Sequence, residues 1–143
     1  MFVCGPPGSG KTTYVAERAK RGDLIIDLDD LWEALTGLGR FDESEILLPY
    51  IHEARNAVLK RWGAYRNCDI WFIHCAAWRD KRRAARRMFD ADVVILEVSP
   101  NECVRRSEGR GSDRVKLFDM ATAWWREYQK YPNDPEETVI KES

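Results

Sequence analysis

Four short apolar runs recur along the chain, and each is followed by a segment with helical spacing. They lie at Met1–Cys4, Leu24–Ile26, Asp69–Cys75 and Val93–Val98. Within each run the apolar residues are nearly continuous, which is typical of parallel strands that are covered on both faces. Alternation of such strands with helices predicts an α/β fold, a three-layer sandwich around a parallel sheet of four or five strands.

Turn residues mark the boundaries of the first helices. Helical spacing runs from Tyr14 to Arg21, and Gly22 follows in a position suited to a helix C-cap. A second helix is expected to stop at Gly63, with Pro49 near its first turn. Its apolar stripe is formed by Leu47, Ile51, Ala54 and Val58.

The last third of the chain carries its own capping signals. Ser99–Glu102 reads SPNE, a capping box with proline in the first helical position, directly after the strand at Val93–Val98. Ser112 is a candidate cap for the final helix, which should end before Pro132. The apolar side of that helix consists of Leu117, Ala121, Trp124, Trp125 and Tyr128. The final TVIKES predicts a short edge strand.

The composition is that of an ordinary globular protein, with 44% hydrophobic and 33% charged residues in a chain of 143. This length favours a single domain over residues 1–143. Six tryptophans argue for an ordered, well-packed structure. Because the net charge is −1, any attraction to nucleic acid or a membrane must come from local patches.

No apolar run reaches the length of a membrane span, and the first residues lack the basic segment of a secretion signal. The four cysteines, Cys4, Cys68, Cys75 and Cys103, form no Cys-x-x-Cys pair. We therefore expect a cytoplasmic protein whose cysteines are buried free thiols and which has no membrane partner.

The strand–helix pattern is broken most sharply by GPPGSGKTT at Gly5–Thr13, which contains GxxxxGK[ST] between a strand and a helix. Such glycines let a loop wrap around an anion with its N–H groups pointing inward, and the next helix adds partial positive charge. Lys11 supplies a full charge at the outer phosphates, and the Thr12 hydroxyl can complete a Mg²⁺ shell. We predict that ATP and Mg²⁺ are bound by Gly5, Pro6, Pro7, Gly8, Ser9, Gly10, Lys11, Thr12 and Thr13.

A second informative stretch, LIIDLDDLWEAL, places three acids at the end of a predicted strand. Carboxylates here can face the cleft above the sheet, where ligands of such folds bind. In the functional interpretation one carboxylate, with Asp27 as the candidate, helps to hold Mg²⁺, and another accepts the proton of an acceptor hydroxyl. In the alternative, Asp29 or Asp30 caps a helix that begins at Leu31.

A third stretch, CVRRSEGRGSDRV, clusters arginines around two glycines. Glycines around arginines suit a segment that moves. The stretch is similar to the arginine-bearing lid of P-loop kinases, and this resemblance implies that residues 105–114 are a lid that closes over a triphosphate. In this interpretation Arg110 stabilises the transition state, while Arg106 and Arg114 bind the nucleotide. The alternative is a solvated basic turn.

With these residues the chain resembles the P-loop NTPase superfamily and its small kinases. GPPGSGKTT is among the commonest forms of that superfamily's loop, and Asp27-x-Asp29 is similar to the pattern in shikimate- and gluconate-type kinases. Asp29-Asp30 also resembles the acidic pair of polynucleotide kinases, where the first acid is the proposed base. The arginine of those kinases is replaced here by Leu31-Trp32-Glu33. The resemblance implies a P-loop kinase-like fold with Asp29 as the base.

The third predicted strand ends in His74-Cys75-Ala76 and lacks the acidic pair that AAA-type motors and helicases use to bind Mg²⁺ and activate water. Small kinases can act without that pair. His74 is a candidate for lining the cleft, or else a core histidine. The leading hypothesis is therefore a kinase that phosphorylates a hydroxyl acceptor. The alternatives are an ATPase and an ATP-binding regulatory module, and the choice between ATP and GTP is open.

One basic run, RDKRRAARR at Arg79–Arg87, lies on a predicted helix after the third strand. It can be a surface that tracks a polyanion such as nucleic acid. It can also be a solvated helix face whose other side, with Ala84, Ala85, Met88 and Phe89, packs inward. We expect a small-molecule acceptor slightly more than a nucleic acid.

Overall fold

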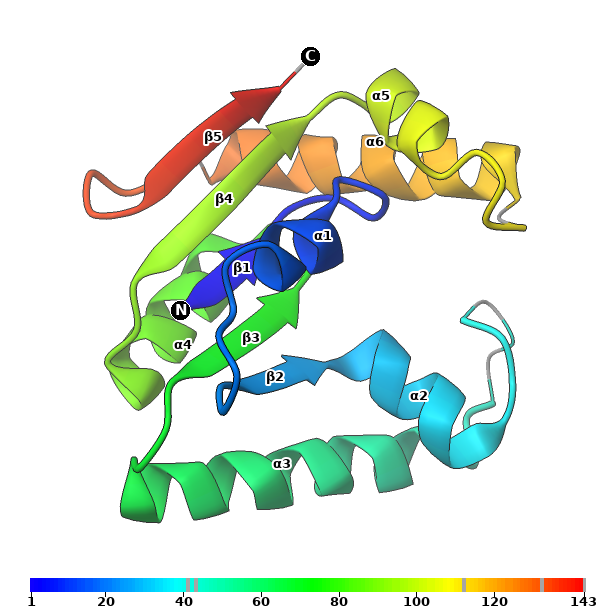
Figure 1. Ribbon diagram of the computed structural model, residues 1–143. Helices are drawn as coiled ribbons and strands as arrows, with labels where there is room; N and C mark the ends of the chain where they lie inside the picture. The colour runs from blue at the N-terminus through cyan, green and yellow to red at the C-terminus, as the bar shows by residue number, and fades with distance from the viewer. Residues whose placement is uncertain (41, 43, 112, 132, 143) are drawn as a thin grey trace. The chain divides into compact units, whose positions relative to one another are not determined.

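The computed structural model describes residues 1–40, 42, 44–111, 113–131 and 133–142, and these residues form a five-stranded parallel sheet with helices (Figure 1). The strand order is β2-β3-β1-β4-β5. The strands are β1 (Phe2–Cys4), β2 (Leu24–Asp27), β3 (Ile70–His74), β4 (Val93–Val98) and β5 (Thr138–Glu142). The predicted α/β sandwich is confirmed, and β5 is the edge strand expected from TVIKES.

The chain divides into two compact units. The first, which we call the P-loop unit, combines Met1–Arg18 with Ile73–Ser143. The second unit is Ala19–Phe72.

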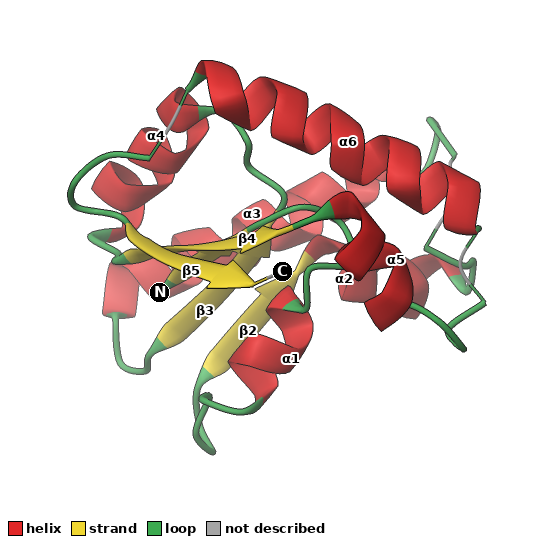
Figure 2. Cartoon of the chain, turned by 90° about the horizontal axis from the view of Figure 1, so that it is seen from above, coloured by secondary structure: helices red, strands yellow, loops and turns green. Residues whose placement is uncertain are grey.

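In the P-loop unit, β1 pairs in parallel with β4, and β4 pairs in parallel with β5. Helix α1 (Lys11–Ala16) lies on one face of these strands, and α4 (Arg79–Phe89) and α6 (Arg114–Lys130) lie on the other (Figure 2). Covered on both faces, β1 is fully buried and β4 is buried at every position except Glu97. This explains the continuous apolar runs of the sequence.

Helix α1 is shorter than predicted. It begins at Lys11 and ends at Ala16, whereas the spacing suggested Tyr14 to Arg21. The Arg18 N–H donates to the Val15 carbonyl oxygen, a tighter turn than the α-helical one, and only Val15 of the helix is buried. With a single residue in the core, little packing is available to extend the helix.

The two helices after β4 are capped by side chains. Ser99 caps α5 (Pro100–Arg106) by accepting the Glu102 N–H at 3.3 Å, as the capping box predicts. Helix α6 is capped by Asp113, whose carboxylate accepts the N–H groups of Val115 and Lys116. Ser112, the predicted cap, lies outside the described residues, and the assignment was wrong by one position. The predicted apolar stripe of α6 is confirmed, with Leu117, Ala121, Trp124 and Tyr128 buried.

In the second unit, α2 (Leu28–Thr36) begins directly after β2 and packs against α3 (Leu48–Tyr65). Asp27 caps α2, with its Oδ1 accepting the Asp29 N–H at 3.0 Å. The helix therefore starts before Leu31, and its cap is Asp27 rather than Asp29 or Asp30. Helix α3 has Pro49 in its first turn, as predicted, but continues past Gly63.

The four cysteines are free thiols in different environments. Cys4 and Cys103 are buried and Cys68 is half-buried, but Cys75, the first residue after β3, is exposed. The expectation of burial was wrong for Cys75. Within the described ranges, no helix is long and apolar enough to cross a membrane.

Candidate functional site

The phosphate loop connects β1 to α1, and its glycines are required by close packing. A Cβ atom on Gly5 would lie 2.9 Å from the Leu96 carbonyl oxygen of β4. Gly8 has a φ of 78°, and a Cβ atom there would lie 2.9 Å from the Cys103 carbonyl oxygen of α5. Larger residues at either position would push the loop away from β4 and α5. Gly5 and Gly8 are thus the two positions where the loop packs against the backbone of β4 and α5.

The polar groups of the loop fit the binding of a phosphate chain. Lys11 Nζ donates to the carbonyl oxygens of Gly5 at 3.1 Å and Pro6 at 2.8 Å, so its charge is held at the loop. Ser9 is fully buried, and its Oγ has no hydrogen-bond partner in the part of the chain that the structure describes. Thr12 and Thr13 are exposed at the start of α1. The loop therefore offers a cation, an unused buried hydroxyl and two accessible hydroxyls.

Arg106 connects this loop to two other elements. Its Nη1 donates to the Ser9 carbonyl oxygen at 2.7 Å, and its Nε donates to Glu102 Oε1 of α5 at 2.9 Å. Its Nη2 pairs with the Glu142 carboxylate of β5. Arg105 and Arg106 hydrogen-bond to Glu102 and lower the pKa of that carboxyl to about 2.

A hollow of about 360 Å³ opens beside the loop. It brings together the loop and two of the predicted arginines. The residues around it are Gly8, Ser9, Gly10, Thr13, Tyr14, Glu17, Arg18, Leu96, Arg106, Arg110, Ile140 and Glu142. Arg110 reaches it from the turn after α5, where Gly109 and Gly111 have φ angles of 82° and 69°.

Arg114, the third predicted arginine, lies elsewhere. It is the first residue of α6, and its Nη2 donates to Glu108 Oε1 at 2.9 Å. Together with Arg105 it borders a separate hollow of about 320 Å³ between α5 and α6. The structure thus groups Arg106 and Arg110 with the loop and places Arg114 in another hollow.

The acidic residues of the second unit form a cluster around one arginine. Asp27 is 6% exposed and caps α2, while Asp29 and Asp30 lie in the first turn of that helix. Arg40 Nη2 donates to Asp30 Oδ1 at 2.6 Å, and Arg40 Nε donates to Glu33 Oε1 at 3.1 Å. Desolvation, followed by the charge of Asp27, raises the pKa of Asp30. No group of three or more metal-ligating side chains was found among the described residues.

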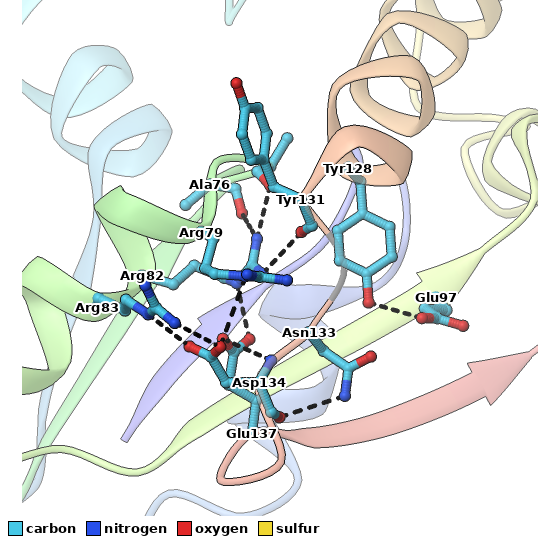
Figure 3. A network of polar contacts seen from close by, with 11 residues as sticks. Ala76, Arg79, Arg82, Arg83, Glu97, Tyr128, Tyr131, Asn133, Asp134 and Glu137 are labelled. Carbon is cyan, nitrogen blue, oxygen red and sulfur yellow. Dashed lines mark hydrogen bonds and ion pairs between the residues drawn. The ribbon is translucent and has the colours of Figure 1, made fainter.

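Most arginines of the basic run on α4 form ion pairs within the P-loop unit (Figure 3). Arg82 is fully buried; its Nε donates to Glu137 Oε2 at 2.7 Å, and its Nη1 donates to the Ala77 carbonyl oxygen at 2.6 Å. Arg83 holds Asp134 through two hydrogen bonds of 2.9 and 3.0 Å. Arg79 also pairs with Asp134, and Arg86 pairs with Glu136. Four arginines of the run are therefore paired with three acids of the segment before β5.

The predicted inward face of α4 was partly wrong. Ala85 and Phe89 are buried, but Ala84 and Met88 are exposed, and Arg82 completes the buried face. Positions 82, 85 and 89 have the spacing of one helix face, so the geometry of the helix was readable. The sequence analysis did not identify Glu137 as the partner of Arg82, although the acidic segment DPEE at 134–137 was a signal for it.

The parallel strand order, the glycine loop between β1 and α1 and the flanking arginines define a P-loop fold of the kinase type. A model of the AAA domain family matches residues 1–134, and the chain belongs to this family. A search of curated protein sequences gives no match.

Solved structures agree with this fold. A shikimate kinase from Bacteroides thetaiotaomicron is 17% identical with a TM-score of 0.61, covering 98% of this chain and 84% of its own. A gluconokinase from Sinorhizobium meliloti 1021 is 16% identical with a TM-score of 0.60, covering 98% and 80%. A deoxyadenosine kinase from M. mycoides with bound dATP is 17% identical with a TM-score of 0.56, covering 98% and 89%.

These likenesses confirm the predicted resemblance to small P-loop kinases at the level of fold. Although the chain belongs to the AAA domain family, the acidic pair of AAA motors is not found after β3. The strand ends at His74 and is followed by Cys75-Ala76.

Proposed function

We propose that the protein is an ATP-dependent kinase that transfers the γ-phosphoryl group of Mg²⁺-ATP to a hydroxyl acceptor. The observation that carries this proposal is the phosphate loop with Lys11, beside a hollow that Arg106 and Arg110 border. The closely packed glycines and the unused Ser9 hydroxyl fit a loop that binds the phosphates of a nucleotide.

Each loop residue has a proposed task. The backbone N–H groups of Gly8–Thr13 would bind the phosphates, and Lys11 would exchange its carbonyl partners for outer phosphate oxygens. Thr12 and Asp27 are proposed to hold Mg²⁺. When bound, Mg²⁺-ATP supplies the transferable phosphoryl group and neutralises part of its charge. Arg110 would add positive charge where negative charge develops.

Residues 105–114 are proposed to act as a lid, with Arg114 recruited to the nucleotide when this segment moves. The positive φ angles of Gly109 and Gly111 support this proposal, because they lie in the turn that joins α5 to α6. Arg114 would then have to leave Glu108, an exposed ion pair that is inexpensive to break.

Asp29 is proposed as the base that accepts the proton of the acceptor hydroxyl. It is exposed in the first turn of α2, directly after the cap residue Asp27 and Leu28. If Asp29 is the base, Asp29→Asn should lower phosphoryl transfer by roughly 10²–10⁴-fold at nearly unchanged ATP affinity. Full turnover by this variant would assign the base elsewhere.

The acceptor is proposed to be a small molecule. Arg82, Arg83 and Arg86 of α4, which could have followed a nucleic acid backbone, are paired with Glu137, Asp134 and Glu136. These pairs reduce the positive charge available to a polyanion on this helix.

An ATPase is the second candidate, favoured by the match to the AAA domain family. Incubation with γ-labelled Mg²⁺-ATP separates the two. The acceptors to supply are polyols, hydroxy acids, nucleosides and 5′-hydroxyl oligonucleotides, with Lys11→Ala as the control. Acceptor-dependent label transfer supports the kinase, and acceptor-independent release of phosphate supports the ATPase. Tight binding without turnover would indicate a regulatory module.

A further inference from the structure

Arg106 contacts the phosphate loop through a backbone carbonyl group, and this contact restricts one peptide plane. The Ser9 carbonyl oxygen accepts from Arg106 Nη1 at 2.7 Å. The Ser9 carbonyl and the Gly10 N–H belong to the same peptide, and no cis peptide occurs in the described residues. In a trans peptide the C=O and N–H bonds point in opposite directions. While Arg106 holds the carbonyl, the Gly10 N–H is turned away from the arginine.

Gly10 can occupy this position because it has a φ of 90° and no side chain. A Cβ atom there would lie 3.4 Å from Arg106 Nη1, at van der Waals distance. The last glycine of the motif is therefore favoured by the left-handed backbone rather than by the space beside the guanidinium.

Two carboxylates from different elements fix the guanidinium itself. Glu102 of α5 accepts from Nε at 2.9 Å, and Glu142 of β5 pairs with Nη2. Glu102 is 13% exposed and Glu142 is 47% exposed. All three directions of the guanidinium fork are thus used, one by the loop and two by acids. This arrangement neutralises Arg106 rather than leaving its charge directed at the hollow.

We propose that Arg106 is a positioning residue that orients the Ser9–Gly10 peptide for phosphate binding, with Glu102 and Glu142 holding Arg106 in place. The inference rests on the proposed binding of a nucleoside triphosphate at this loop. It replaces the expectation that Arg106 contacts the nucleotide directly with an action through Ser9. It also makes β5 part of the phosphate site, although no residue of β5 belongs to the motif.

The first test measures binding of Mg²⁺-ATP and of inorganic tripolyphosphate to the full chain by calorimetry. Arg106→Ala should weaken both ligands by about tenfold or more, because the peptide loses a charge-assisted hydrogen bond. Lys141→Ala is the matched control. It removes a positive charge from β5, and the strand alternation turns Lys141 to the face opposite Ile140 and Glu142, so both affinities should stay within about twofold. Weakening of ATP without weakening of tripolyphosphate would mean that Arg106 contacts the nucleoside, and would overturn the proposal.

The second test is a double-mutant cycle with Glu142→Gln. Removing this carboxylate changes the local field in any background, so the informative quantity is its effect with Arg106 present relative to its effect in Arg106→Ala. If Arg106 has a positioning role, Glu142→Gln should reduce the affinity for tripolyphosphate about two- to fivefold more in the wild-type background than in the Arg106→Ala background. If Arg106 binds phosphate directly, releasing it from Glu142 should instead favour binding in that background.

Two further measurements keep the test decisive. Arg106→Lys retains the charge but cannot hold the carbonyl and both carboxylates, so it should restore only part of the lost affinity. Full restoration would contradict a positioning role. If Arg106→Ala does not fold, as judged by its thermal transition, the affinity of Arg106→Lys compared with that of the wild type still gives the answer. Failure of the wild-type chain to bind either ligand would instead refute nucleotide binding itself.

Discussion

Two arginine-rich regions of the P-loop unit look alike in sequence but differ in what their arginines do. On α4, the Arg82 side chain is fully buried, and its partner Glu137 is buried with it. At the end of α5, Arg106 is 27% exposed and contacts the phosphate loop. The first set stabilises the fold, and the second borders the candidate site. Basic residues in a sequence therefore gain a functional meaning only when their counter-charges are located.

The largest effect on stability is expected from Arg82→Ala. It would leave the Glu137 carboxylate buried without its cation, which costs about 3–5 kcal/mol of unfolding free energy. Urea denaturation measures this loss. Arg87→Ala, on the exposed face of the same helix, is the control and should stay within about 0.5 kcal/mol. Replacing both partners by apolar residues, as in Arg82→Met with Glu137→Leu, should recover much of the stability. An equal loss in the control would remove the distinction between the two regions.

Lys11→Ala should show the opposite profile, with the fold intact and the ligand lost. Mg²⁺-ATP at 100 times its dissociation constant should stabilise the wild type by about 2.7 kcal/mol, and the variant should show little of this stabilisation. Thermal-shift titration measures both. The lost hydrogen bonds to Gly5 and Pro6 are part-buried and should cost only about 1 kcal/mol without ligand. Equal stabilisation of both proteins by ATP would refute the phosphate loop assignment.

The proposed lid offers a comparison of mobility. Trypsin should cleave within residues 105–114 without nucleotide, and an ATP analogue should slow that cleavage. Arg82 and Arg83 of α4 serve as internal controls, because the ion pairs to Glu137 and Asp134 are independent of nucleotide. Cleavage at Arg110 that ignores the analogue would leave residues 105–114 as an ordinary turn.

The smallest effect concerns the titration of Glu102. Its folded pKa of about 2 lies below the ordinary value of 4.5, so its contribution to stability is present above pH 4.5 and is lost as the pH falls toward 2. NMR titration of the carboxyl carbon should report this value. Arg105 is the first cause and Arg106 the second, so each alanine variant should raise the pKa, Arg105→Ala more strongly. An unchanged pKa in Arg106→Ala would show that Glu102 does not hold Arg106 in solution.

Local features were predictable from the sequence, and distant pairings were not. The strands and the phosphate loop follow from runs and spacings of a few residues, and so does the Ser99 cap. Asp27 as the cap of α2 was also readable, since it precedes the helix by one residue, but the functional interpretation drew attention to Asp29. Arg82 and Glu137 lie 55 residues apart, and Arg106 and Ser9 lie 97 apart. No periodicity or capping rule connects residues at such separations.

The packing of the phosphate loop has a consequence for the order of folding. Gly5 packs against Leu96, Gly8 packs against Cys103, and Ser9 is held by Arg106, so these three supports come from residues synthesised long after the loop. A nascent chain that has emerged only as far as the end of the second unit would contain the complete motif, but the loop would lack these contacts. Contacts of such long sequence separation form late. Competence to bind phosphate should therefore arise only after β4 and α5 have left the ribosome, which makes ligand binding a reporter of completed folding for this chain.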